Sequence, residues 1–277
     1  MTASFPTYLS VSRDELGQGT GVQVRVVGDM AALARDMARH MFDKIVTAQG
    51  TPLTIIAPVG PVDQYPLLAE MIQQQSLDCQ HLLMINMDEY LTEDDSWISK
   101  DHPLSFRGYM DRKFYDLLSP SLAPPPENRI FPDPQHPDRI QQIIDERGGV
   151  DVTYGGIGIN AHLAFNEPEG DVSLEEFASR PTRLLNLSPH TRTINANTVG
   201  GDIQVIPERA ITVGMCEILQ SKELQFYCNR PWQSAVVRRL LHGPITAACP
   251  ASLLRTHANT TLTIADYVAE LPDIRLR

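Results

Sequence analysis

Short apolar runs alternate with amphipathic stretches along this chain. The apolar runs, several of them rich in β-branched residues, predict strands at 22–27, 53–58, 82–87, 150–157, 210–213, 224–228 and 261–265. Apolar residues at helical spacing predict helices that begin after Asp29 and that cover about 65–75, 102–118, 136–147 and 232–242. Strands that alternate with amphipathic helices are typical of a mostly parallel sheet covered on both faces.

This alternation predicts a single α/β domain, a Rossmann-like three-layer sandwich, over residues 23–277. Residues 1–22 are weakly patterned, and we expect them to form an N-terminal extension on the surface. The region 168–208 shows no clear period and is expected to be irregular. No internal repeat emerges, which agrees with one domain.

Composition and charge narrow the class of protein. The net charge of −11 and the absence of a basic patch argue against nucleic-acid binding. No apolar run approaches the ~18 residues of a membrane span, and the N-terminus lacks the pattern of a secretory signal. The four cysteines are widely spaced without a CxxC or Cys/His pattern. We therefore expect reduced thiols in a cytoplasmic protein and no structural zinc site.

Three segments with candidate chemistry lie where predicted strands end, at 58–61, 88–90 and 158–167. Ligands of open α/β sheets bind beyond the carboxyl ends of the strands, so we expect these segments to form one site. Glycines there allow the backbone to approach a ligand closely. The imidazole of His162 and the carboxylates of Asp88 and Glu167 indicate acid/base chemistry on a small molecule.

The chain carries Asn-Met-Asp-Glu-Tyr at 86–90, Gly-Gly-Ile-Gly-Ile-Asn-Ala-His-Leu-Ala-Phe-Asn-Glu-Pro at 155–168, His-Thr-Arg at 190–192 and Gly-Pro-Ile-Thr at 243–246. These motifs resemble those of the glucosamine-6-phosphate deaminase/isomerase family. The likeness runs in order over roughly 23–268. The related 6-phosphogluconolactonases typically carry Asp-Glu-Arg at the first motif and Ser-Leu-Phe-Pro after the histidine. Asp-Glu-Tyr and Ala-Phe-Asn-Glu-Pro therefore place this chain on the isomerase side.

The resemblance implies the opening of an amino-sugar phosphate ring, proton transfer between C1 and C2, and loss of ammonia to leave a ketose phosphate. It assigns Asp88 as the base over the C1–C2 bond. It assigns His162 to protonate the ring oxygen and to take the O1 proton, and Glu167 to orient this histidine. It implies a sugar or sugar phosphate as the partner, no cofactor and no metal, because hydrogen bonds can stabilise an enediol-type intermediate. The sequence leaves open whether the protein forms a homo-oligomer.

The chain departs from the family pattern beside the histidine. Family members usually carry aspartate two residues before it, whereas this chain has Asn160. An amide can hold the imidazole of His162 by accepting a hydrogen bond, but it supplies no negative charge to stabilise an imidazolium. We include Asn160 with the catalytic residues, in a supporting role.

The expected phosphate-binding elements also differ. The family loop Thr-Gly-Gly/Ser-Thr-Pro is replaced by Val-Gly-Pro-Val-Asp at 59–63, which makes a poor nest for an anion. The family lysine after a later strand aligns with Gln233. Arg192 is the clearest remaining anion-binding residue. The predicted substrate-binding residues are Gly60, Gly158, Arg192 and Gln233.

Two alternatives to a deaminase of the family substrate follow from these departures. One is a catalytically impaired homologue that binds a sugar and serves a regulatory role. The other is an isomerase for a different sugar, either unphosphorylated or otherwise anionic. The sequence does not rank them.

Overall fold

The computed structural model describes residues 5–61 and 63–275. Its central sheet has seven parallel strands in the order β1-β10-β9-β6-β2-β3-β5. The strands are β1 (Val22–Val27), β2 (Leu53–Ala57), β3 (Leu82–Asn86), β5 (Arg129–Ile130), β6 (Val152–Gly156), β9 (Leu224–Cys228) and β10 (Thr260–Ala265).

A smaller antiparallel sheet has the order β4-β8-β7. It is built from β4 (Asp88–Leu91), β7 (Arg183–Asn186) and β8 (Arg209–Thr212). Only Met87 separates the end of β3 from the start of β4, so the chain passes directly from the central sheet into the small one. This passage places the beginning of β4 at the carboxyl edge of the central sheet.

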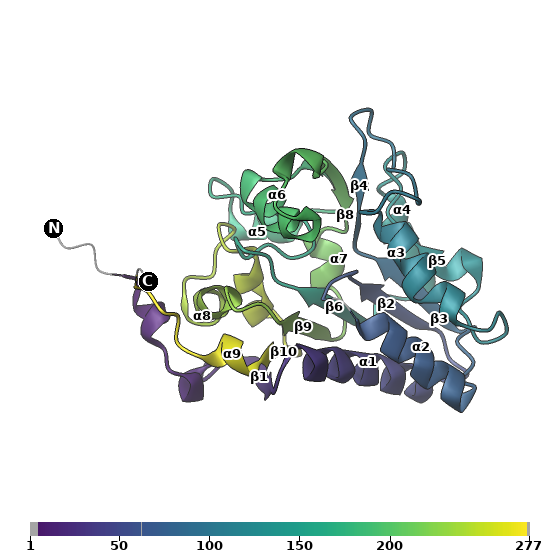
Figure 1. The fold of residues 1–277 in the computed structure, drawn as a ribbon, viewed down its shortest axis with the longest axis horizontal. Helices are drawn as coiled ribbons and strands as arrows, with labels where there is room; N and C mark the ends of the chain where they lie inside the picture. The colour runs from purple at the N-terminus through teal and green to yellow at the C-terminus, as the bar shows by residue number, and fades with distance from the viewer. Residues whose placement is uncertain (1–4, 62, 276–277) are drawn as a thin grey trace.

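The helices are α1 (Met30–Thr47), α2 (Gln64–Gln75), α3 (Phe106–Lys113), α4 (Arg139–Arg147), α5 (Leu174–Ala178), α6 (Pro189–Asn195), α7 (Met215–Leu219), α8 (Gln233–His242) and α9 (Asp266–Ala269). Figure 1 shows α1 and α2 along the lower side of the central sheet, and α7 and the small sheet on its upper side. This arrangement confirms the predicted Rossmann-like α/β class with a parallel sheet between two outer layers.

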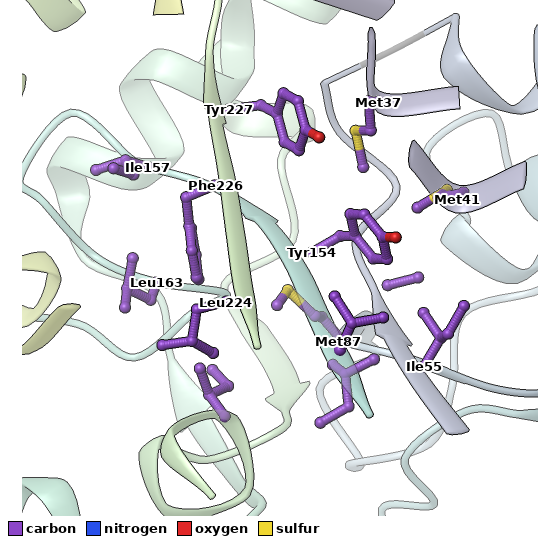
Figure 2. Packing of buried hydrophobic residues seen from close by; sticks show 14 of the residues in the cluster. Met37, Met41, Ile55, Met87, Tyr154, Ile157, Leu163, Leu224, Phe226 and Tyr227 are labelled. Atoms are coloured by element: carbon purple, nitrogen blue, oxygen red, sulfur yellow. The ribbon is translucent and has the colours of Figure 1, made fainter. Parts of the chain in front are cut away.

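Apolar side chains fill both sides of the central sheet. Met37 and Met41 of α1 lie on the same side of the strands as Tyr154, whereas Leu163 and Phe226 lie on the other side (Figure 2). All five residues are 0% exposed. Successive side chains of a strand point to opposite faces, so each central strand contributes to both cores.

The prediction of an irregular region at 168–208 is wrong. This region contains α5, β7 and α6, and β7 pairs with β8 in the small sheet. The strand predicted at 210–213 exists as β8, but it belongs to the small antiparallel sheet. Elements of four to seven residues are too short to show a period of their own, which explains why the pattern gave no signal.

The single helix predicted at 102–118 is also too long. Ser105 caps α3 by accepting a hydrogen bond from the backbone N–H of Gly108, and the α-helix ends at Lys113. A 3-10 turn at Tyr115–Leu117 follows. Phe114 and Tyr115 are both buried, and two consecutive side chains of a regular α-helix diverge by about 100°. Phe114 leaves helical geometry, with φ −137° and ψ −67°, and this break lets both rings reach the core.

The N-terminal segment is attached to the domain at several points. Leu16 is buried, and the guanidinium of Arg13 forms ion pairs with Asp266 and Glu270. Nε of the buried Arg238 in α8 donates a hydrogen bond to the carbonyl oxygen of Val11 at 2.8 Å. The described part of this segment, residues 5–22, therefore packs against α8 and the C-terminal helix. Residues 1–4 of the predicted extension lie outside the described residues.

Two findings bear on the expected class of protein. No helix among the described residues has both the length and the apolar character needed to cross a membrane. The four cysteines are free thiols, and Cys79, Cys228 and Cys249 are buried. Their positions agree with the expected reduced thiols.

Candidate active site

A cavity of about 930 Å³ opens at the carboxyl edge of the central sheet. Its floor is formed where β2, β3, β6 and β9 end, which are neighbours in the sheet. The lining includes the predicted residues Gly60, Asp88, Gly158, His162 and Gln233. The fold therefore brings together side chains that are far apart in sequence, as expected for a parallel α/β sheet.

Asp88 supplies the only carboxylate among the described lining residues. It is the first residue of β4 and pairs with Thr212 of β8, which fixes its backbone at the cavity wall. The side chain is 8% exposed, and no described residue forms an ion pair or a hydrogen bond with its carboxylate. Burial, assisted by the adjacent charge of Glu89, raises the pKa of Asp88 to about 8.

Glu89 serves the fold instead. Its carboxylate is fully buried and accepts hydrogen bonds from the backbone N–H groups of Phe106 and Arg107 at 3.0 and 2.9 Å. Ser105 Oγ donates a third at 2.9 Å. Successive side chains of a strand point in opposite directions, so Asp88 faces the cavity while Glu89 holds the start of α3.

His162 lies on a tight loop after β6. Ala161 and Ala164 have positive φ angles of 70° and 52°, and the backbone N–H of Gly158 donates to the carbonyl oxygen of His162 at 3.0 Å. The imidazole packs directly on Gly158, where a Cβ atom would lie 2.1 Å from His162 Cε1. Only glycine fits beneath the ring, which explains the residue type at position 158.

Asn160 links His162 to Glu167. His162 Nδ1 lies 2.8 Å from Asn160 Oδ1, and Asn160 Nδ2 donates to Glu167 Oε2 at 2.6 Å. The amide orientation is fixed at both ends, because the backbone N–H of His162 can only donate and a carboxylate can only accept. Nδ1 must therefore carry the proton, and Nε2 of the neutral ring is left as an acceptor toward the cavity.

Two residues at the start of α6 complete this chain of hydrogen bonds. The backbone N–H of Ser188 donates to Glu167 Oε1 at 3.1 Å, and Thr191 Oγ1 lies 3.2 Å from His162 Nδ1. Neither residue was predicted as a site residue. Ser188-Pro189 is the signature of a helix start, with a capping serine and proline in the first turn. That signal could have placed Thr191 beside the predicted histidine.

The charges of this group follow from its surroundings. Burial lowers the pKa of His162, and the carboxylate of Glu167, 3.8 Å from Nδ1, opposes that shift. Burial acts to raise the pKa of Glu167, but His162 and hydrogen bonds from Thr191, Asn160 and Ser188 outweigh it and lower the pKa. Near neutral pH the site therefore holds a neutral imidazole and an ionised Glu167.

No protein-family model matches the chain, but curated relatives do. Glucosamine-6-phosphate deaminase 1 of Bacillus subtilis is 30% identical over 245 residues, which cover 86% of this chain and 95% of the relative. The chain belongs to the glucosamine-6-phosphate deaminase family. A glucosamine-6-phosphate deaminase of Phocaeicola vulgatus is also 30% identical, over 85% of this chain and 88% of the relative. The resemblance stated from the motifs is thereby confirmed.

Solved structures agree with this membership. A monomeric glucosamine-6-phosphate deaminase superposes with a TM-score of 0.79 at 27% identity, covering 91% of this chain and all of that one. A 6-phosphogluconolactonase from Trypanosoma cruzi gives a TM-score of 0.63 at 13% identity, covering 90% of this chain and 96% of that one. At this identity the likeness to the lactonase shows a shared fold alone.

The predicted substrate-binding residues of this deaminase-family chain differ in whether they line the cavity and in what they contact. Gly60 and Gly158 line the cavity. Gln233 also lines it, but its amide is engaged within the protein: Oε1 accepts from the backbone N–H of Arg230 at 2.7 Å, and Nε2 donates to the carbonyl oxygen of Ile157 at 2.7 Å. Gln233 therefore braces two turns at the cavity wall.

Arg192 does not belong to the cavity lining. Its guanidinium pairs with Glu208 at 2.7 Å and donates to the carbonyl oxygen of Ile203 at 3.2 Å. It follows Thr191 in α6, and a step of one residue turns a helical side chain by about 100°, away from His162. The structure gives no support to the predicted anion-binding role of Arg192. Of the predicted loop at 59–63, Val62 lies outside the described residues.

Proposed function

We propose that this protein is an aldose–ketose isomerase and deaminase of an amino sugar, with Asp88 and His162 as its catalytic residues. The observation that carries the proposal is the pairing of a buried, unpartnered carboxyl with an imidazole whose Nε2 is free, in one cavity. Membership in the glucosamine-6-phosphate deaminase family supports the same chemistry. Among the described residues, no cluster of three or more His, Cys, Asp and Glu side chains could hold a metal ion.

His162 acts first, in ring opening. Its neutral Nε2 takes the proton from O1 of the closed sugar while the C1–O5 bond breaks and a C1 aldehyde forms. The imidazolium then delivers that proton to O5, so the histidine returns to its neutral state. Asn160 and Glu167 support the transient charge, because Asn160 Oδ1 accepts from Nδ1 and Glu167 lies 3.8 Å away.

Asp88 acts second, in proton transfer along the carbon chain. Its carboxylate removes the proton from C2 of the open-chain amino aldehyde, and the electron pair forms a C1–C2 double bond as O1 takes a proton from the ammonium group of the sugar. Asp88 then returns its proton to C1 and leaves an imine at C2. Water adds to this imine and ammonia departs, so the products are a ketose and ammonia.

The raised pKa of Asp88 has a consequence for this scheme. In the free protein the carboxyl is mostly protonated at pH 7, because its pKa is about 8. A hexosamine brings an amino group next to the carboxyl, and a positive charge there favours the carboxylate. Binding of the amino sugar therefore helps to create the base that acts on it.

The test is a panel of free and phosphorylated amino and keto sugars, with ammonia release and aldose–ketose exchange as readouts. We expect turnover on at least one amino sugar and a loss of about a thousandfold or more in Asp88→Asn, as is usual when the proton-transferring group is removed. At limiting substrate, the rate should rise with pH up to about 8, where Asp88 ionises. Turnover that survives in Asp88→Asn would falsify the proposed role of Asp88.

A second candidate is a sugar-binding homologue without turnover. It is favoured by Asn160, which supplies no charge to His162, and by the protonated state of Asp88 at neutral pH. Binding of an amino sugar without ammonia release at pH 7 and pH 9 would select this candidate. Turnover that depends on Asp88 would reject it.

A further inference from the structure

Two turns form one side of the cavity, on either side of the end of β6. They are residues 58–61 after β2 and residues 229–233 after β9, and we refer to them together as the turn wall. The side chains of Val59, Pro61 and Pro231 carry no hydrogen-bond donor, and the amide of Gln233 is engaged within the protein. The turn wall differs in this respect from the hydrogen-bonded group around His162.

The turn after β2 offers few donors to an anion. Pro58 and Pro61 have no backbone N–H, so among residues 58–61 only Val59 and Gly60 carry one. The hydroxyl of Tyr65 in α2 donates to the carbonyl oxygen of Pro58. An anion nest requires several convergent N–H groups, and the described residues 58–61 carry only two.

Several backbone N–H groups in and next to the turn after β9 donate hydrogen bonds within the protein. The backbone N–H of Arg230 donates to Gln233 Oε1, and the backbone N–H groups of Gln233 and Ser234 donate to the carbonyl oxygens of Arg230 and Pro231 at 2.9 and 3.3 Å. Pro231 has none. Among the described residues of this turn, the backbone N–H groups of Asn229 and Trp232 have no hydrogen bond.

Positive charge at the turn wall is limited to one residue. Arg230 is the single lysine or arginine among the described lining residues, and its side chain is exposed at the rim. A solvated guanidinium contributes little to binding, about 0–1 kcal/mol for a typical exposed ion pair. A phosphate dianion against this wall would lose its hydration without gaining a buried cation that matches its charge.

Neutral hydrogen-bonding groups are present in the same cavity. Tyr109, Asn197 and Thr198 belong to the lining. Asn229, which is 5% exposed, has an amide Nδ2 with no hydrogen-bond partner among the described residues. Hydroxyl and amide groups suit the hydroxyl groups of a sugar, and the indole of Trp232 offers an apolar surface for its C–H face.

From this contrast we infer that the substrate is a hexosamine whose C6 carries a free hydroxyl rather than a phosphate. The inference rests on the proposed function and deepens it by naming the substrate class. The unphosphorylated end lies against the turn wall, while C1 and C2 lie at His162 and Asp88. Relatives named for glucosamine 6-phosphate act on a charged sugar, so the substitutions at the turn wall define a change of specificity.

The first test compares glucosamine with glucosamine 6-phosphate by ammonia release. We expect kcat/KM to be at least about tenfold higher for the neutral sugar, which corresponds to 1.4 kcal/mol. Inorganic phosphate at the same concentration as the sugar should not inhibit competitively. A higher kcat/KM for the phosphate ester, or competitive inhibition by inorganic phosphate, overturns the inference and leaves the proposed function standing.

Calorimetry separates recognition from chemistry. The probes are the open-chain amino alcohol 2-amino-2-deoxyglucitol and its 6-phosphate, which cannot isomerise. Tighter binding of the neutral compound supports the inference even if neither sugar is turned over, a result that would count only against the proposed function. Tighter binding of the phosphate, or binding of neither compound, overturns the inference.

A pair of variants addresses the turn wall itself. Gln233→Lys adds a cation to it and should shift the ratio of the two kcat/KM values toward the phosphate ester by about tenfold, the scale of one new charge-assisted contact. Arg230→Gln should change that ratio less than about threefold, as for an exposed charge. A drop of a hundredfold for the phosphate ester in Arg230→Gln would show that Arg230 holds a phosphate, and the inference would fail.

Discussion

The loop around His162 and the turn wall belong to the same cavity but are built differently. In the loop, Asn160, Glu167 and Thr191 connect to His162 through hydrogen bonds of 2.6–3.2 Å. In the turn wall, the side chains of Val59 and Pro61 carry no donor, the amide of Gln233 is engaged within the protein, and Asn229 Nδ2 has no partner among the described residues. Under the proposed function, this difference in hydrogen bonding means that the geometry of proton transfer at His162 and the recognition of the far end of the sugar can change independently.

Asp88 provides the largest expected effect, on stability. Its pKa is raised from 3.8 to about 8, so the folded protein binds a proton more tightly than the unfolded chain. Stability therefore falls as pH rises between these values, by up to about 1.4 kcal/mol per pH unit. Asp88→Asn should remove this dependence and be more stable than the parent at pH 8.

Urea unfolding at pH 5, 6.5 and 8 measures this effect. The control is Asp101→Asn, which changes an exposed acid outside the cavity lining. If the parent and Asp88→Asn lose stability equally between pH 5 and pH 8, the carboxyl is not destabilised by burial. The contrast between an unpartnered Asp88 and a satisfied His162 group would then fail.

The sequence predicted the residues of the candidate site whose side chains can act as acids or bases. Asp88 and His162 could be placed at the cavity because glycines and acid/base side chains follow apolar runs, and the parallel sheet brings those ends together. Glu167 lies outside the lining and is joined to His162 through Asn160. Thr191 was missed because α6 is seven residues long and has no period of its own. Arg192 was predicted to bind an anion at the site, but it lies outside the cavity lining. The direction of its side chain depends on where α6 begins, and a local sequence pattern does not give that position.

Breaking the hydrogen-bond chain tests the loop. Asn160→Leu keeps the approximate volume but removes the acceptor from Nδ1, so the imidazole loses its fixed tautomer. We expect the rate of ammonia release to fall by about a hundredfold or more, because loss of a tautomer-fixing partner costs up to ~10⁴ in a protease triad. Asn160→Asp restores an acceptor, adds charge beside Nδ1 and should recover activity with the pKa of His162 raised.

The readout that separates positioning from folding is the pH profile of the rate. Asn160→Asp should move the limb assigned to His162 to higher pH, because a carboxylate favours the imidazolium. A profile identical to the parent in both variants, with equal thermal stability, would show that Asn160 does not act through His162.

Gly158 tests the packing beneath the imidazole. In Gly158→Ala the new Cβ would lie 2.1 Å from His162 Cε1, so the ring must move. We expect a loss of activity of about a hundredfold, in line with the cost of displacing a catalytic group by 1 Å. The matched control is Gly170→Ala, where an added Cβ has no neighbour within 4 Å. Equal rates in the two variants would mean that the loop adapts without moving the histidine.

Thr191 provides the smallest expected effect and the finest test of the comparison. Thr191→Val keeps the shape of the side chain but removes the hydroxyl 3.2 Å from His162 Nδ1. Asn160 still holds Nδ1 at 2.8 Å, so the tautomer should persist, and we expect a three- to tenfold loss of activity, about the value of one neutral hydrogen bond.

Because Thr191 also supports the ionised form of Glu167, the variant should raise the pKa of that carboxyl. Carbon-13 NMR titration of Glu167 measures that shift directly, and Thr193→Val, on the exposed side of α6, is the control. A loss as large as that of Asn160→Leu would mean that Thr191, not Asn160, is the partner that fixes the histidine.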